Sequence, residues 1–271
     1  MDNHNSESSI FTKNTSKVKT GTVLKFLSKD LEDVTVNSVV DLKHHRQSPN
    51  LGAEATKPKV QLITPNNIIY FKFGLTDNEI CAELLAYHLA KQLEINATLT
   101  SLAWYKNTIG VASWSIGEYT EPDDSRSYSV TDYLHIKGFF EMCLFDYLIM
   151  NEDRHAGNWG IRDGEVAPLF DHNVSFGGEQ SPVDKEIFMV GLTSPLDTGV
   201  EYHQQHDKIL TLLYELDSAK VQKFLALLET VGEIDLPALK ELYPKQYGII
   251  VKLLQARVLY MFRRVGEFRG R

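Results

Sequence analysis

The feature that most constrains the fold is an apolar run that ends in a cluster of polar side chains. The run stops at Met150, the cluster includes Asp153 and Asn158, and a second short apolar run leads to Asp171. A carboxylate such as Asp153 can accept a proton or orient a hydroxyl, while Asn158 and Asp171 offer the hard oxygen ligands that Mg²⁺ prefers. The simpler interpretation is a polar helix end followed by a turn, because Asp and Asn favour both positions. Together with a suitable lysine upstream, the three residues favour a site of chemistry.

The overall composition is that of a globular protein large enough for two lobes around a cleft. The chain has 271 residues, of which 43% are hydrophobic and 24% charged. The formal net charge of −8 argues against broad binding to nucleic acid or an anionic membrane, although it leaves room for a small basic pocket. The two cysteines, Cys81 and Cys143, lie in apolar runs, which indicates reduced core residues rather than a disulfide framework or zinc site.

The N-terminal sequence has neither a basic leader nor an apolar stretch. No run in the chain approaches the roughly 18 apolar residues that would span a bilayer. We therefore expect a cytoplasmic protein that does not bind a membrane. Residues 1–20, which are rich in polar side chains, are expected to form a flexible lead-in.

The first half of the chain has the alternating apolar pattern and turn signals of β-strands. One or two strands are predicted in 22–42, and single strands at 60–63, 68–73, 99–104 and 108–115. Residues 43–59 combine turn formers with a cluster of cations and predict a long loop. An acidic, proline-containing segment at 117–126 interrupts the pattern and suggests the junction between two parts of the chain.

Two charged residues stand out in this half. Lys72 interrupts an apolar strand, and taken alone it is more simply a solvated lysine on an exposed face. A helix begins at Thr76, with Glu79 three residues later as in a capping box, and continues to about Gln92. Glu83 lies near the apolar side of this helix, where a carboxylate needs a partner. Lys72 is the candidate partner, and an ion pair with a neighbour on the helix surface is the alternative.

The second half is predominantly helical in pattern. Apolar residues recur at helical spacing from Ile136 to Leu148, which predicts one helix that begins near Thr131 or Asp132. Further helices are predicted at 209–216, 220–231, 236–242 and 247–266. Pro237 suits a first helical turn, and Pro244 suits a helix boundary. The chain is thus predicted to be α+β, with a β-rich N-lobe at 21–116 and a mostly helical C-lobe at 117–271.

Residues 145–158 resemble the catalytic segment of HipA-like serine/threonine protein kinases. In that family an apolar helix leads into Asn-x-Asp-Arg-His-x-x-Asn, which is present here from Asn151 to Asn158. The Asp-Arg-His-x-x-Asn part is shared with phosphoinositide lipid kinases. The chain is similar to the shorter family members that consist of the kinase domain alone. The resemblance implies a two-lobed protein-kinase-like fold and the use of ATP with Mg²⁺.

The resemblance also assigns roles to individual residues. Asp153 corresponds to the catalytic aspartate, Asn158 to a catalytic magnesium ligand and Asp171 to the second magnesium ligand. Lys72 corresponds to the strand lysine that contacts the nucleotide phosphates and contributes to catalysis. Glu83 corresponds to the helix acid that pairs with this lysine in the nucleotide site.

The long loop is similar to the loop that covers the phosphates in this family. Gly52, Ala53 and Lys59 are therefore expected to contact the nucleotide, and Ser48 corresponds loosely to a serine that such kinases phosphorylate. Positions near Ser113 and Ser115 are expected to bind the base.

Several assignments have rivals or depart from the family pattern. Glu79 is the alternative to Glu83 as the acid that pairs with the strand lysine. Arg154 is interpreted as the partner of an acid rather than of a phosphorylated residue, and Trp159 as a packing residue. Asp171 is followed by His172 and Asn173 instead of Phe-Gly.

The resemblance implies an enzyme that phosphorylates serine or threonine of a protein substrate, as a toxin or as an effector delivered to another cell. An antitoxin chain is a possible partner, and no direct binding of nucleic acid is expected. Two alternatives stay open. One is a lipid kinase, to which the shared Asp-Arg-His motif points, and the other is a kinase-fold module that binds nucleotide without turnover.

Overall fold

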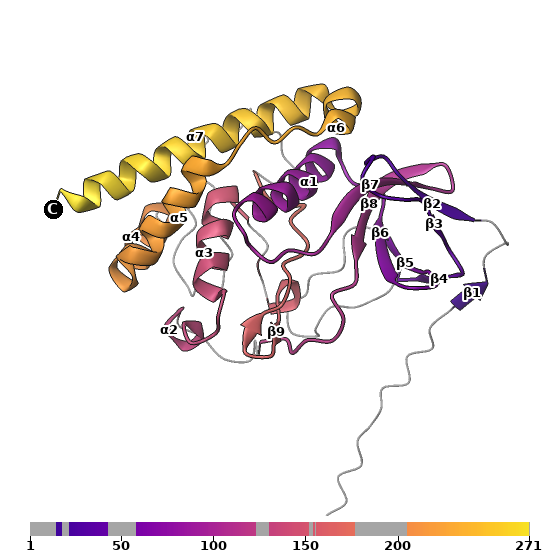
Figure 1. Ribbon diagram of the computed structural model, residues 1–271, viewed down its shortest axis with the longest axis horizontal. Helices are drawn as coiled ribbons and strands as arrows, with labels where there is room; N and C mark the ends of the chain where they lie inside the picture. Colours follow the sequence, from indigo (N-terminus) through magenta and orange to yellow (C-terminus); the bar gives the residue numbers. More distant parts are fainter. Residues whose placement is uncertain are drawn as a thin grey trace, which may run out of the picture.

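In a computed structural model of the chain, the structure describes residues 15–17, 22–42, 58–122, 130–151, 154, 156–176 and 205–270. A curved antiparallel sheet occupies one end of the molecule and most of the helices occupy the other (Figure 1). This arrangement is the α+β architecture that the sequence predicts. Within the described residues, no helix is both long enough and apolar enough to cross a bilayer.

Among the described residues, the sheet has eight strands in the order β1-β4-β5-β6-β8-β7-β2-β3. The strands are β1 (Thr15–Lys17), β2 (Val23–Phe26), β3 (Val34–Thr35), β4 (Ser38–Asp41), β5 (Lys59–Ile63), β6 (Ile68–Lys72), β7 (Thr100–Tyr105) and β8 (Thr108–Trp114). All of the predicted strand regions are present. The register of β5 and β6 places Lys59 opposite Lys72, and β8 places Val111 on the other side of Lys72.

A close backbone approach holds β6 against β8. A Cβ atom built on Gly110 would lie 2.2 Å from the carbonyl oxygen of Lys72 and 2.7 Å from Cζ of Phe71. Phe71 is almost fully buried and packs in the core of the sheet with Leu62, Ile69 and Ala112. Gly110 is therefore needed where the strand that carries Lys72 meets its neighbour.

Helix α1 (Asp77–Gln92) begins and ends where the sequence predicts. Thr76 is its N-cap, and the reciprocal bonds of Thr76 and Glu79 complete the capping box. The helix is buried along much of its length because it packs against β7 and β8 on one side and α7 (Pro244–Arg269) on another. Figure 1 shows α1 between the sheet and the remaining helices. Its apolar residues share one core cluster with α3 (Phe139–Ile149).

The prediction of a single helix from about residue 131 to 148 is wrong. Two helices, α2 (Val130–Tyr133) and α3, are separated by a turn that ends at Gly138, whose φ of 84° lies in the left-handed region. The turn lets the ring of Tyr133 pack against both Phe139 and Trp159. The apolar periodicity continues through the turn because both helices face the same core.

The elements after α3 complete the helical part. They are η1 (Ala156–Asn158), β9 (Ile161–Arg162), β10 (Glu165–Val166), α4 (Gln205–Leu216), α5 (Ser218–Thr230), α6 (Pro237–Leu242) and α7. These last four helices match the predicted ones, although α7 begins earlier, at Pro244. Pro237 lies in the first turn of α6 as predicted. Cys81 and Cys143 are buried free thiols, which confirms their assignment to the core.

Several sequence predictions lie outside the described residues. They concern most of the N-terminal lead-in, the loop with Ser48, Gly52 and Ala53, the polar residues Asp153 and His155, and the segment 177–204.

Gly110→Ala is expected to lower the free energy of unfolding by about 1–3 kcal/mol, because the added methyl group must displace backbone in a packed sheet. The matched control is Gly248→Ala in α7, where nothing lies within 4 Å of the added Cβ. This control should gain about 0.5–1 kcal/mol from helix propensity. Urea unfolding followed by circular dichroism measures both, and an unchanged midpoint for Gly110→Ala would contradict the close approach.

Candidate active site

The centre of the site is a buried lysine held between two carboxylates. Nζ of Lys72 lies 3.2 Å from Oε1 of Glu83 and 2.9 Å from Oδ1 of Asp171. The Lys72 side chain is only 10% exposed, so the interpretation of Lys72 as a solvated surface lysine is wrong. The strand β6, the helix α1 and the segment after β10 each contribute one of these three groups.

The electrostatics of the three groups are coupled. Burial alone would lower the pKa of Lys72, but the carboxylates of Asp171 and Glu83 outweigh burial and raise it above its ordinary value. Burial would likewise raise the pKa of Asp171, but Lys72 and then Lys59 outweigh it and lower that pKa from 3.8 to about 2. Lys72 is therefore a cation and Asp171 a carboxylate at neutral pH. Lys59 contributes a second positive charge to the same site.

Helix α1 also contacts the backbone that follows Asp171. Oε2 of Glu83 accepts a hydrogen bond from the backbone N–H of His172 at 2.8 Å. Glu83 rather than Glu79 is thus the acid beside Lys72, as the sequence favoured, while Glu79 belongs to the capping box. His172 is buried against the ring of Phe145, and burial together with the charge of Arg154 lowers its pKa well below the ordinary value.

A second buried ion pair supports the segment around the predicted catalytic aspartate. Arg154 donates from Nε and Nη2 to the two carboxylate oxygens of Asp146, at 2.9 Å and 3.0 Å, and both residues are fully buried. Asn151 donates to Asp146 as well, at 2.9 Å. The prediction that Arg154 pairs with an acid is confirmed. Residues 151 and 154, which flank Asp153, are therefore both fixed to α3.

The same arginine joins the two segments that carry the candidate metal ligands. Nη1 of Arg154 donates to the backbone carbonyl of Asn158 at 2.6 Å and to that of Phe170 at 3.0 Å. Asn158 and the residue before Asp171 consequently meet at one guanidinium group. Trp159, next to Asn158, packs against Tyr133 and Phe139, as its interpretation as a packing residue requires.

The two side chains predicted to bind a metal are of the kind that suits Mg²⁺. Asp171 supplies an ionised carboxylate and Asn158 an amide oxygen, and both are hard ligands. Within the described part of the chain, no group of three or more His, Cys, Asp or Glu side chains is arranged to hold a metal ion. Mg²⁺ in nucleotide sites commonly takes one or two protein ligands and completes its shell with water and phosphate oxygens.

The middle of β8 lies beside the lysine. Ser113 pairs with Tyr70 across the sheet, and Val111 pairs with Lys72, so Ser113 shares a face with Lys72. Its hydroxyl lies 3.2 Å from that of Thr100 and is buried, whereas the Ser115 hydroxyl accepts a bond from the backbone of Gly117. A contact of either serine with a nucleotide base stays a prediction.

The segment that leaves β8 is tied to the helical part. Nη1 of Arg162 donates to the carbonyl of Ile116 at 2.6 Å, and Thr120 and Ile161 exchange two backbone hydrogen bonds. These contacts hold the connection between the sheet and the residues that lead to Asp171.

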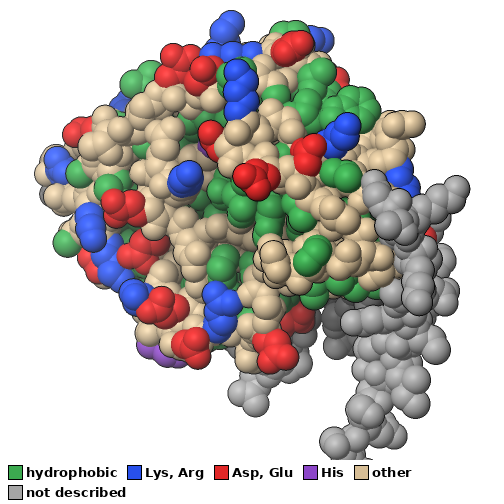
Figure 2. Space-filling view, turned by 45° about the vertical axis from the view of Figure 1, so that its right-hand side comes forward, with side chains coloured by type: hydrophobic (Ala, Val, Ile, Leu, Met, Phe, Trp, Pro, Cys, Tyr) green, Lys and Arg blue, Asp and Glu red, His purple; other side chains and the backbone are tan. Residues whose placement is uncertain are grey.

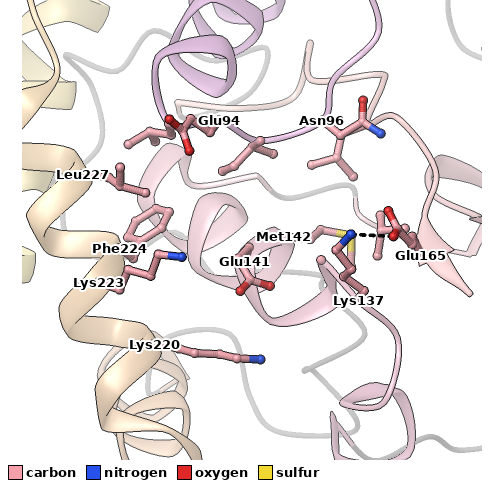
Figure 3. Close-up of a pocket in the computed structure, with 15 residues that line it drawn as sticks. Glu94, Asn96, Lys137, Glu141, Met142, Glu165, Lys220, Lys223, Phe224 and Leu227 are labelled. Atoms are coloured by element: carbon pink, nitrogen blue, oxygen red, sulfur yellow. Dashed lines mark hydrogen bonds and ion pairs between the residues drawn. The ribbon is translucent and has the colours of Figure 1, made fainter.

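A separate cavity of about 410 Å³ lies on another side of the helical part. It is bounded by the end of α1, the start of α3, β10 and α5, and does not include the three charged groups of the site. Figure 3 shows Lys220 and Lys223 on one side of this cavity and Asn96 and Glu165 on the opposite side. On the face drawn in Figure 2, acidic and basic side chains are interspersed rather than separated by sign.

Sequence reasoning missed Asp146 and Asn151, which support the site without contacting Lys72. The available signal was an acid inside an otherwise apolar helix, since a buried carboxylate in that position needs a partner.

The sheet, the helix α1 and the charged cluster between sheet and helices define a protein-kinase-like fold, as the sequence predicts. No protein-family model matches the sequence, and no curated protein matches it. Among solved structures, the chain is similar to the proinflammatory kinase CtkA of Helicobacter pylori, with a TM-score of 0.52 and 19% identity over 81% of this chain and 95% of that chain. It is also similar to HipA of Shewanella oneidensis MR-1, solved with HipB and operator DNA, with a TM-score of 0.45 and 14% identity over 83% of this chain and 68% of that chain. At such identities the likeness to CtkA shows the fold alone.

Arg154→Met is expected to lower the free energy of unfolding by about 3–5 kcal/mol, because it leaves the carboxylate of Asp146 buried without its counter-ion. Lys137→Met is the matched control, since it removes one partner of an exposed ion pair with Glu165 and should change stability by less than about 1 kcal/mol. Guanidinium chloride unfolding compares the two. Equal effects would show that the Arg154 contacts contribute no more than a surface pair.

The lowered pKa of Asp171 predicts a stability difference that depends on pH. The carboxylate is stabilised in the folded state, so its contribution is fully present above its unfolded pKa of about 4 and is lost as pH falls toward about 2. The free energy of unfolding of the wild type minus that of Asp171→Asn should therefore decrease by on the order of 2 kcal/mol between pH 5 and the acid limit. A difference that stays constant over this range would contradict the ion pair with Lys72.

Proposed function

We propose that the protein is an ATP- and Mg²⁺-dependent kinase that phosphorylates serine or threonine of a protein substrate. The observation that carries this proposal is Lys72, a buried cation held by Glu83 and Asp171. The segment that leads to Asp171 is in turn joined to Asn158 through Arg154. Phosphoryl transfer requires fixed positive charge at the phosphates and an oriented hydroxyl. The site supplies a lysine for the first requirement, and its sequence supplies Asp153 for the second.

In this proposal each residue has a distinct task. Glu83 holds Lys72 in place while the ammonium group donates to phosphate oxygens of the nucleotide. Asn158 and Asp171 hold Mg²⁺, which when bound neutralises charge on the phosphates. Asp153 accepts a hydrogen bond from the substrate hydroxyl and orients it toward the transferred phosphoryl group. The contacts of Asn151 and Arg154 with Asp146, on either side of this aspartate in the sequence, support the assignment.

The remaining nucleotide contacts are proposed from the sequence resemblance. Gly52 and Ala53 would cover the phosphates, and Ser113 and Ser115 would lie near the base. Lys59 would add a second cation near the phosphates, which its effect on the pKa of Asp171 supports.

We place the protein among HipA-like kinases on the motif from Asn151 to Asn158. On that assignment it acts in the cytoplasm, or in a recipient cell as an effector, on a protein substrate. An antitoxin chain would be its regulatory partner, and Ser48 would be a site of autophosphorylation. The net charge of −8 supports a protein that does not itself bind nucleic acid.

Incubation of the wild type with γ-labelled ATP and Mg²⁺ is expected to label the protein or an added protein substrate. Asp153→Asn and Asp171→Asn should lower the initial rate by at least about 100-fold, because each removes a carboxylate with a direct part in the proposed phosphoryl transfer. Asp163→Asn, which removes the same charge from an exposed turn, should keep the wild-type rate.

The same assay separates the alternatives. Label transferred only to lipid vesicles would favour a lipid kinase, and Mg-ATP binding without transfer to any substrate would favour a binding module. Wild-type activity in Asp153→Asn would reject the assignment of the catalytic aspartate.

A further inference from the structure

Helix α1 directs two buried carboxylates toward the residues that follow Asp171. Glu79 and Glu83 are four residues apart, so they lie one above the other on the same side of the helix. Their side chains are almost fully buried. Glu83 accepts a bond from the backbone of His172, and Oε1 of Glu79 accepts one from Nδ2 of Asn173 at 3.4 Å.

The second oxygen of Glu79 binds the start of its own helix. Oε2 accepts hydrogen bonds from the backbone N–H of Thr76 at 2.7 Å and from its hydroxyl at 2.9 Å. A capping box of this kind also forms at exposed helix starts, so it does not by itself explain a completely buried glutamate. The hydrogen bond from Asn173 to Oε1 connects this helix start to the loop after Asp171.

Asp171 needs such support because of its backbone conformation. Its φ of 60° lies in the left-handed region, which non-glycine residues rarely adopt. The residues after it are anchored at three points: His172 to Glu83, Asn173 to Glu79, and Phe176 to the carbonyl of Ile149 at 2.8 Å. The anchor at Asn173 joins two side chains, and it lies two residues after the candidate metal ligand Asp171.

We propose that Glu79 and Asn173 are positioning residues that hold Asp171 in the orientation required for Mg²⁺. The proposal rests on the proposed function, because it treats Asp171 as a ligand of Mg²⁺ bound with ATP. Neither Glu79 nor Asn173 touches the metal or the nucleotide in this scheme. Loss of their contact weakens Mg²⁺ binding because Asp171 then spends less time in the required orientation.

The test uses variants that break the hydrogen bond between Glu79 and Asn173 and then restore it with the carboxylate and the amide exchanged. Asn173→Asp places a carboxylate opposite Glu79, and the double variant Glu79→Gln/Asn173→Asp restores one amide–carboxylate bond. Gln is compatible with a capping box, so the start of α1 is kept. Asn173→Ala removes the contact without adding charge. The control is Asp217→Ala, which removes the N-cap of α5 and should lower stability by about 1 kcal/mol without affecting Asp171.

Isothermal titration calorimetry with ATP at a series of Mg²⁺ concentrations measures the half-saturating Mg²⁺ concentration for the 271-residue chain. Asn173→Asp is expected to raise it about tenfold, which corresponds to about 1.4 kcal/mol, and Asn173→Ala about threefold. The double variant should return to within about threefold of the wild type, and Asp217→Ala should match the wild type. Binding of ATP without Mg²⁺ should match the wild type in Asn173→Ala and Asp217→Ala, which a general loss of structure would not allow.

Two results would overturn the inference while leaving the proposed function in place. One is a wild-type Mg²⁺ requirement in Asn173→Asp and Asn173→Ala, and the other is a folded double variant that recovers nothing relative to Asn173→Asp. A wild type whose ATP binding does not respond to Mg²⁺ would instead overturn the proposed function, and this inference with it.

Discussion

The structure depends most on how the buried ammonium group of Lys72 is compensated for the water that it has lost. A buried cation is unfavourable unless opposite charges and hydrogen bonds replace its hydration shell. Two carboxylates, on Glu83 and Asp171, take that place. Because these carboxylates belong to a helix and to a segment 99 residues further along the chain, the lysine is satisfied only when sheet, helix and C-terminal part have come together.

A second buried charge organises the C-terminal part in the same way. The carboxylate of Asp146 is shared by Arg154 and Asn151, and Arg154 continues to the carbonyls of Asn158 and Phe170. The first pair therefore sets where Asp171 lies relative to the lysine, and the second sets where Asn158 lies relative to the segment that leads to Asp171. The backbone at the site is irregular and lacks the regular hydrogen bonds of a helix or sheet. The side chains of these two sets of buried charges hold it in place instead.

Local signals in the sequence predicted local structure well. Thr76 and Glu79 marked the start of α1, and the turn residues between β5 and β6 marked that hairpin. The break between α2 and α3 was missed because both helices contribute apolar residues to one core, so helical periodicity continues across Gly138. Glycine alone does not distinguish a break from a tolerated position within a helix.

The site was predictable in its residue types and less so in its contacts. Glu83, a helix acid near apolar positions, needed a partner and so indicated Lys72, although Lys72 taken alone was more simply a solvated lysine. The need of Asp146 for a partner was visible in the sequence, but the identity of that partner was not, since Arg154 lies beyond the left-handed turn at Met150 that ends α3. The bond of Glu79 to Asn173 likewise depends on how α1 meets a loop 94 residues away.

The arrangement also explains why the two parts of the fold must meet at this place and orientation. Of the three groups that surround the centre of the site, Lys72 comes from the sheet, Glu83 from α1 and Asp171 from the C-terminal part. A shift of α1 along its axis would remove Glu83 from both Lys72 and the backbone of His172. It would leave the buried Lys72 with Asp171 but without its second carboxylate, and the N–H of His172 without its acceptor, each at a cost of about 1–3 kcal/mol. The position of α1 and the geometry of Asp171 therefore change together. A ligand that binds both Lys72 and Asp171 acts on the whole interface between the sheet and the helices.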